Sequence, residues 1–99
     1  MPVKYNGEYC HFLGVISDKD NFAIAVSILE NGPINFSDLR DELGFRRNFL
    51  AGHLKKLISC SYIFSKKVGR EKLYYLNTST VLPLIKIIKK HIRKHRTGR

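Results

Sequence analysis

Residues 44–57, which read GFRRNFLAGHLKKL, contain the side chains that most clearly indicate what the protein binds. Arg47 and Asn48 fall near the start of an expected helix. A guanidinium group matches the O6 and N7 atoms of guanine, and a carboxamide matches N6 and N7 of adenine. At the start of a helix these two side chains would reach base edges, which indicates contact with double-stranded DNA.

Three more residues of this stretch are expected at the DNA interface. Arg46 and Lys55 are cations of the expected helix. Arg46 is a further candidate for base readout, and Lys55 would hold a phosphate. Gly52 costs roughly 1 kcal/mol inside a helix relative to alanine. Close approach to a DNA backbone or to another helix would explain that glycine. A surface glycine of no consequence is an equal alternative.

A second group of cations surrounds one glycine further along the chain. Residues 62–76 are typical of a β-hairpin, because β-branched and aromatic residues occupy both arms and Gly69 supplies the turn. The cations near the tip are Lys66, Lys67, Arg70 and Lys72. A basic hairpin could serve solubility alone, but four cations around one turn favour contact with phosphates.

The charges of the chain are divided unevenly along its length. Residues 1–45 carry three Lys or Arg and seven Asp or Glu, whereas residues 46–99 carry fifteen Lys or Arg and one acid, Glu71. The net charge is +10. A positive surplus that coincides with the expected helix and hairpin favours a polyanionic partner over a generally basic soluble protein.

Two helices are expected before the basic one. Asp18 or Ser17 caps a helix that runs to about Glu30, and Gly32 and Pro33 end it. Ser37 is the expected N-cap of the next helix, which Gly44 ends. The third helix is expected over residues 46–61, with its buried stripe formed by Leu50, Leu54, Leu57 and Ile58.

Helix, tight turn, basic helix and basic hairpin, in this order, are typical of a winged helix-turn-helix. We therefore expect a mainly α fold with a β-hairpin wing. Ninety-nine residues suit one domain, residues 1–99, with a winged-helix core over residues 18–76. The role of residues 1–16 is open; a helix that packs across a dimer is one interpretation.

Residues 80–96 are expected to form a C-terminal dimerisation helix. Pro83 suits its first turn. The apolar stripe on this helix is wider than one small core can bury, so a second protomer is the expected cover. The residues of that stripe are Val81, Leu84, Ile85, Ile88 and Ile92.

The sequence offers little for metal or catalytic chemistry. Cys10 and Cys60 form no metal motif, although an intersubunit disulfide through either stays open. His91 and His95 stand four residues apart, but no acid follows Glu71 to complete a site, so we expect no metal and no cofactor. Motifs for phosphate loops, paired carboxylates or nucleophiles are missing, which argues against an enzyme.

Residues 38–76 resemble the ArsR-type winged-helix regulators and, more loosely, the MarR type. The matching positions are Leu39, Leu43, Gly44, Phe45, Leu50, His53, Leu54, Lys55, Leu57, Gly69, Tyr74, Tyr75 and Leu76. The resemblance implies a core position for His53. The chain departs from the family at Arg46 and Arg47 and at Ala51 and Gly52, and it lacks the cysteine metal motif. The chain also looks like small stand-alone regulators of archaea and their viruses.

We therefore expect sequence-specific binding of double-stranded DNA by a homodimer that regulates transcription. The alternatives are a nonspecific architectural or chromatin protein and a winged-helix module that binds protein. Attachment of residues 81–96 to a membrane surface is the weakest alternative. No small-molecule ligand is evident. The N-terminus lacks the apolar core of a signal peptide, and no apolar run could span a membrane, so we expect a cytoplasmic protein, in the host cytoplasm if viral.

Overall fold

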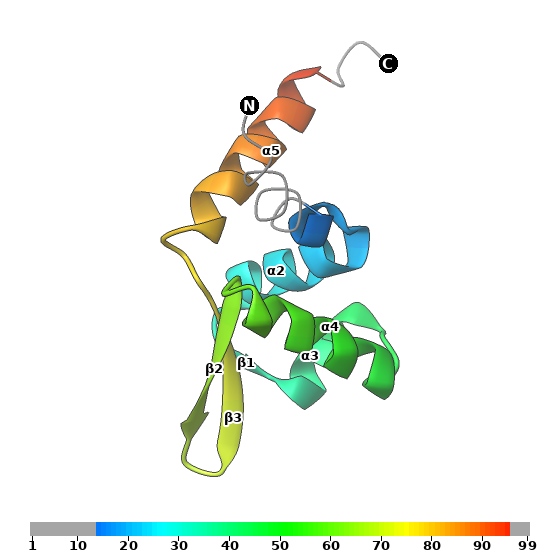
Figure 1. Ribbon diagram of the computed structural model, residues 1–99, viewed down its shortest axis with the longest axis vertical. Helices are drawn as coiled ribbons and strands as arrows, with labels where there is room; N and C mark the ends of the chain where they lie inside the picture. Colours follow the sequence, from blue (N-terminus) through cyan, green and yellow to red (C-terminus); the bar gives the residue numbers. More distant parts are fainter. Residues whose placement is uncertain (1–13, 96–99) are drawn as a thin grey trace, which may run out of the picture.

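A computed structural model describes residues 14–95 of the chain (Figure 1). Residues 14–17 are helical and lead into α2. The elements that follow are α2 (Lys19–Asn31), β1 (Ile34–Asn35), α3 (Phe36–Leu43), α4 (Arg47–Ser59), β2 (Ile63–Val68), β3 (Glu71–Leu76) and α5 (Val81–His95). This order is a winged helix-turn-helix: α3 and α4 flank the tight turn, and β2 and β3 form the wing. The expected fold class is confirmed.

The cap of α2 is the predicted one. The carboxylate of Asp18 accepts the backbone N–H groups of Asp20 at 2.9 Å and of Asn21 at 3.0 Å. The hydrogen bond from Asn21 is the main reason that the pKa of Asp18 is lowered. The helix ends at Gly32, whose φ of 76° suits a residue without a side chain.

The cap of α3 differs from the predicted one. Asn35, not Ser37, is the N-cap, and its side-chain oxygen accepts the backbone N–H of Asp38 at 2.8 Å. The amide nitrogen of Asn35 donates to the Glu71 carboxylate at 2.6 Å. Asn caps as well as Ser does, and this second bond ties the start of α3 to the wing. Gly44, with φ of 71°, ends the helix as predicted.

The sheet has three strands, in the order β1–β3–β2. The wing strands are antiparallel and joined by a two-residue turn at Gly69 and Arg70, where Gly69 has a φ of 65°. Strand β1 pairs with β3 through Ile34 opposite Tyr74. The sequence indicated only an extended link here, because two residues are too few to show an alternating pattern.

One core joins the helices to the base of the wing. Leu39 of α3 and Leu50, Leu54 and Leu57 of α4 are almost entirely buried against α2. Tyr62, at the start of the wing, is fully buried, and this burial raises the pKa of its hydroxyl to about 12. The buried row of α4 fixes which face of that helix points outward.

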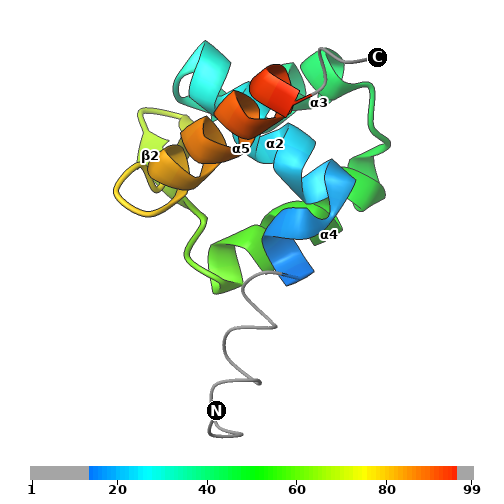
Figure 2. The same cartoon turned by 90° about the horizontal axis from the view of Figure 1, so that it is seen from above.

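The C-terminal helix α5 contributes to this core at its first turns. Val81 and Ile85, which we expected at a dimer seam, are 0% and 1% exposed within one protomer. They pack in the protomer's own core, in one cluster with Ile24 and Ile28 of α2, and Figure 2 shows α5 crossing above α2. Ile87 and Ile92 remain 66% and 48% exposed. Among residues 14–95 there is no helix that is both long enough and apolar enough to cross a membrane.

Candidate nucleic-acid interface

The outward face of α4 carries the predicted reading residues. Asn48, Gly52 and Lys55 follow one another at spacings of four and three, opposite the buried leucines, and all three are exposed. Arg47 is the first residue of the helix and is also exposed. Arg47 is three and seven positions before Leu50 and Leu54, so the first turn of α4 presents the Asn48 carboxamide on the outward face and the Arg47 guanidinium beside that face, at the end of the helix.

The start of α4 is positively charged in two ways. Arg46 occupies the N-cap position but makes no side-chain cap bond, and no acidic residue lies in the first turn. The first backbone N–H groups of a helix lack partners within the helix, and its dipole places positive charge at that end. Arg46 and Arg47 add two cations to this end, so it favours an anion.

Gly52 has open space around it. A β-carbon built on this glycine meets no atom within 4 Å among the described residues. Packing against another part of the described protomer therefore does not explain the glycine. Approach of a partner from outside, such as a DNA backbone or another protein, remains as a reason for its presence.

The wing places two lysines directly opposite each other. Lys67 of β2 pairs in register with Lys72 of β3. Side chains alternate between the faces of a strand, so these lysines share the face of buried Ile63 and Tyr74, which points toward the helices. Like charges directly opposite each other destabilise a hairpin. A bound phosphate would relieve this repulsion.

The other two wing cations lie differently. Lys66 pairs with Leu73 on the opposite face of the hairpin, and Arg70 lies exposed in the turn. The structure thus divides the four predicted wing cations between two faces and the tip. Lys67 and Lys72 are the pair that share a side with α4.

A hollow of about 300 Å³ joins the outward face of α4 to the wing. Its walls include Ala51 and Lys55 from α4 and Lys72 and Tyr74 from β3. The ammonium nitrogen of Lys72 lies 5.7 Å from the centre of the Tyr74 ring, within the range of a cation–π contact. Lys55 and Lys72, seventeen positions apart in the sequence, therefore border one concave surface.

Phe45, Phe49 and His53 form a row of aromatic rings along the flank of α4, which we did not predict from the sequence. The Phe45 and Phe49 ring centres are 5.0 Å apart, and those of Phe49 and His53 are 4.4 Å apart. Phe49 is 42% exposed. The spacing of four residues between successive rings was the signal that could have identified them. An exposed ring beside base-reading residues suits contact with a thymine methyl group.

A buried amide holds this flank of α4 against α2. Asn21 is 2% exposed, and its amide nitrogen donates to the Val15 carbonyl at 3.0 Å. Its oxygen must then accept, so Nδ1 of His53, at 2.7 Å, is the donor. The packing position that the family resemblance implied for His53 agrees with this half-buried contact.

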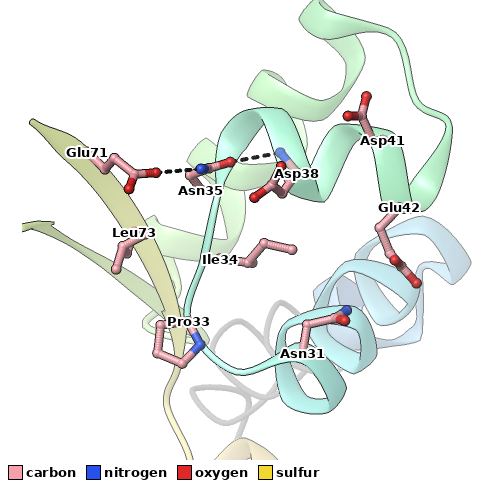
Figure 3. A pocket seen from close by; sticks show the side chains of 9 residues that line it. All are labelled: Asn31, Pro33, Ile34, Asn35, Asp38, Asp41, Glu42, Glu71 and Leu73. Carbon is pink, nitrogen blue, oxygen red and sulfur yellow. Dashed lines mark hydrogen bonds between the residues drawn. The ribbon is translucent and has the colours of Figure 1, made fainter.

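A second hollow, of about 610 Å³, has the opposite charge (Figure 3). It is bordered by Asp38, Asp41 and Glu42 of α3 and by Glu71 of β3. Four carboxylates would repel phosphates, so this side is not part of a DNA interface. Across residues 14–95, no three His, Cys, Asp or Glu side chains are grouped in a way that could hold a metal ion.

The structure describes one of the two cysteines that could form an intersubunit disulfide. Cys60 lies partly buried at the C-terminal end of α4, with its sulfur 3.9 Å from the Ser59 hydroxyl. Cys10 lies outside the described residues. The question of an intersubunit bridge through either cysteine therefore stays open.

Neither a family model nor a curated protein matches the sequence. Solved structures do match the fold. HlyU from Vibrio cholerae N16961 is 17% identical, with a TM-score of 0.76 over 95% of this chain and 98% of that one. An ArsR-like transcriptional regulator from Rhodococcus sp. RHA1 is 24% identical, with a TM-score of 0.70 over 93% of this chain and 86% of that one.

A third similar structure is described as a homodimer. It is the winged helix-turn-helix DNA-binding domain Mb0332 from Mycobacterium bovis, a possible ArsR-family transcriptional regulator. It is 13% identical, with a TM-score of 0.72 over 91% of this chain and 86% of that one. All three are bacterial, so a likeness to archaeal or viral proteins gains no support from them. At these identities the likeness establishes that the chain has a winged helix-turn-helix fold.

Proposed function

We propose that the protein binds double-stranded DNA in a sequence-specific manner and regulates transcription as a homodimer. The observation that carries this proposal is that Lys55 from α4 and Lys72 from the wing border one concave surface, with Lys67 directly opposite Lys72 on the same face of the wing. The similar structures support it, since two of the three are described as regulators or possible regulators and one as a DNA-binding domain.

Each part of this surface has a distinct role in the proposal. Arg47 and Asn48, at the start of α4, read base edges in the major groove, where Arg suits guanine and Asn suits adenine. Lys55 and Lys72, on either side of the hollow, and Lys67, opposite Lys72, hold phosphates and fix the register of the helix on the duplex. Phe49 adds an apolar contact beside Asn48.

The homodimer rests on the part of α5 that the protomer leaves uncovered. Leu84, Ile87 and Ile88 follow at spacings of three and one and lie on one side of the helix. Ile87 is 66% exposed, and Leu84 and Ile88 are half-buried. Together with Ile92 they form an apolar strip that a two-fold partner would cover. Relative to the sequence expectation, Ile87 joins the strip, and Val81 and Ile85 leave it.

Nonspecific DNA binding is the second candidate, and one observation favours it. Ala51 and Gly52 occupy the outward side of α4 without any polar side-chain atom. Few groups are thus left to read bases, whereas cations for phosphates are plentiful. A nonspecific binder would show a steep salt dependence and no preferred sequence.

Selection of binding sites from random duplexes, followed by footprinting, separates the two candidates. We expect a preferred, near-palindromic site. Arg47→Ala should then weaken binding to that site by about 1–3 kcal/mol and relax the preference at one base pair. Lys19→Ala, an exposed cation at the start of α2, is the matched control and should change neither. No enriched sequence after selection would favour the nonspecific candidate.

A further inference from the structure

The exposed side of α5 carries a row of cations that the proposed reading surface does not use. They follow at spacings of three, one, three and one, which places them on one helical face. These residues are Lys86, Lys89, Lys90, Arg93 and Lys94, and all are exposed. Lys89 lies 3.4 Å from the Glu30 carboxylate in an ion pair that is itself exposed. Such an exposed pair contributes little, and the face as a whole is strongly positive.

The five cations of this face repel one another when no anionic partner is bound. Lys86 and Lys90, Lys89 and Arg93, and Lys90 and Lys94 are each four residues apart, and like charges at that spacing destabilise a helix. The helix contains no acidic residue in its sequence. A hollow of about 580 Å³ runs along the face, and its described lining is formed by these five side chains. A row of phosphates along these side chains would remove the repulsion.

The face lies away from the proposed reading surface. Figures 1 and 2 show α2 between α5 and α4, and Figure 1 shows the wing tip at the far end of the molecule from α5. A straight duplex held by α4 and the wing would therefore not run along α5. The two basic surfaces would contact separate stretches of DNA.

The face also stays open in the proposed homodimer. Leu84 of the apolar strip and Arg93 of the basic face are nine positions apart, which is about two and a half helical turns. They thus point in opposite directions from the helix axis. A partner that covers Leu84 and Ile88 would leave Lys86, Lys89 and Arg93 in solvent. Lys90 and Lys94, three and seven positions after Ile87, lie at the edge of the strip.

We propose that the basic face of α5 is a second, sequence-independent DNA-binding surface, through which the protein joins two duplexes. This inference rests on the proposed function for one of the two duplexes only. Double-stranded DNA fits because it presents a regular line of phosphates, about one negative charge per 1.7 Å of axis. A membrane fits less well, because an interfacial helix must turn its apolar side into lipid. In α5, Val81 and Ile85 lie in the core, and the second protomer of the proposed homodimer covers the rest of the apolar side.

A two-duplex capture experiment tests the inference on the full chain. One duplex, containing a selected site, is fixed on beads, and a fluorescent duplex of unrelated sequence is added in solution. The test variant replaces Lys86, Lys90 and Arg93 by Gln, which keeps good helix formers and removes three charges. We expect wild type to capture the second duplex, and the variant to capture about tenfold less while it stays bound to the first.

The matched control keeps the charge and changes only the side chains: Lys86→Arg, Lys90→Arg and Arg93→Lys. It should capture the second duplex as wild type does. Unchanged capture by the Gln variant would overturn the inference, since the two reading surfaces of a dimer would then suffice. Failure of wild type to capture the second duplex, or capture of phosphatidylserine vesicles in its place, would overturn it as well.

Failure of the proposed function has a different signature. A wild-type protein that does not bind the fixed duplex refutes the reading surface. Fluorescence anisotropy with the unrelated duplex alone then decides the role of α5: binding that the Gln variant loses supports it, and no binding contradicts it. Circular dichroism of the Gln variant confirms that α5 remains folded.

Discussion

Removing one of the two opposed lysines of the wing should raise the stability of the free protein and lower its affinity for DNA. Lys67 and Lys72 are directly opposite each other on the face of the wing that points toward the helices. Replacing Lys67 by Met keeps an unbranched side chain and removes one of the two charges. The free protein should become more stable, because a cross-strand pair contributes roughly 0.2–1 kcal/mol and here the pair is repulsive. DNA affinity should fall for all sequences alike.

The change in the salt dependence of DNA binding follows from counterion release. One lost phosphate contact should reduce the slope of log K against log salt by about 0.9. Thermal unfolding at low ionic strength measures the gain in stability, and this gain should shrink as salt is added, since exposed charges are screened. Fluorescence anisotropy over a salt series measures the loss of the phosphate contact.

Lys66→Met is the matched control for this experiment. Lys66 is a neighbour on the same strand, is equally basic and is exposed, but it lies opposite Leu73 on the other face. Its replacement removes the same charge without relieving a direct repulsion. We expect little gain in stability and a smaller change in the salt slope. Equal slopes for the two variants, or a loss of stability in Lys67→Met, would refute the reasoning about the hairpin faces.

Three further predictions concern the N-cap of α3, Gly52 in α4 and the proposed homodimer. Asn35→Ala should destabilise the fold by about 0.5–2 kcal/mol in chemical unfolding, whereas Ser37→Ala, at the expected but unused cap, should have little effect. Gly52→Ala should stabilise the free protein by roughly 1 kcal/mol yet weaken DNA binding; unchanged binding would make it an ordinary surface glycine. Ile88→Glu should give monomers in sedimentation, because an unpaired charge in an apolar seam costs several kcal/mol, whereas Lys86→Glu should leave the dimer intact.

The central part of the fold was predictable because its signals are local and repeated. The buried row of α4 follows a helical period over several turns, and Gly44 and Gly69 mark turns that need a positive φ. Once α4 and the wing are recognised from these signals, their cations can be identified directly from the sequence. Their meeting at one hollow depends on the packing of α4 against the sheet, which no local pattern contains.

The errors arise where a choice depends on tertiary contacts. Asn35 and Ser37 are both good caps, and the bond from Asn35 to Glu71, thirty-six positions away, accompanies the one that is used. The stripe on α5 shows which residues are apolar, but not which of them the protomer itself buries. Val81 and Ile85 were therefore assigned to a seam although they belong to the core. The division of the wing lysines between two faces likewise required the strand register.

Amide chemical-shift mapping by NMR, with less than one equivalent of a duplex that carries a selected site, shows which face of the protein contacts DNA. We expect the largest shifts at Arg47, Asn48 and Lys55 and along the wing at Lys67 and Lys72. The amides around the acidic hollow at Asp38, Asp41 and Glu42 should change little. Shifts confined to the acidic side, or no shifts with any duplex, would rule out DNA binding through α4 and the wing.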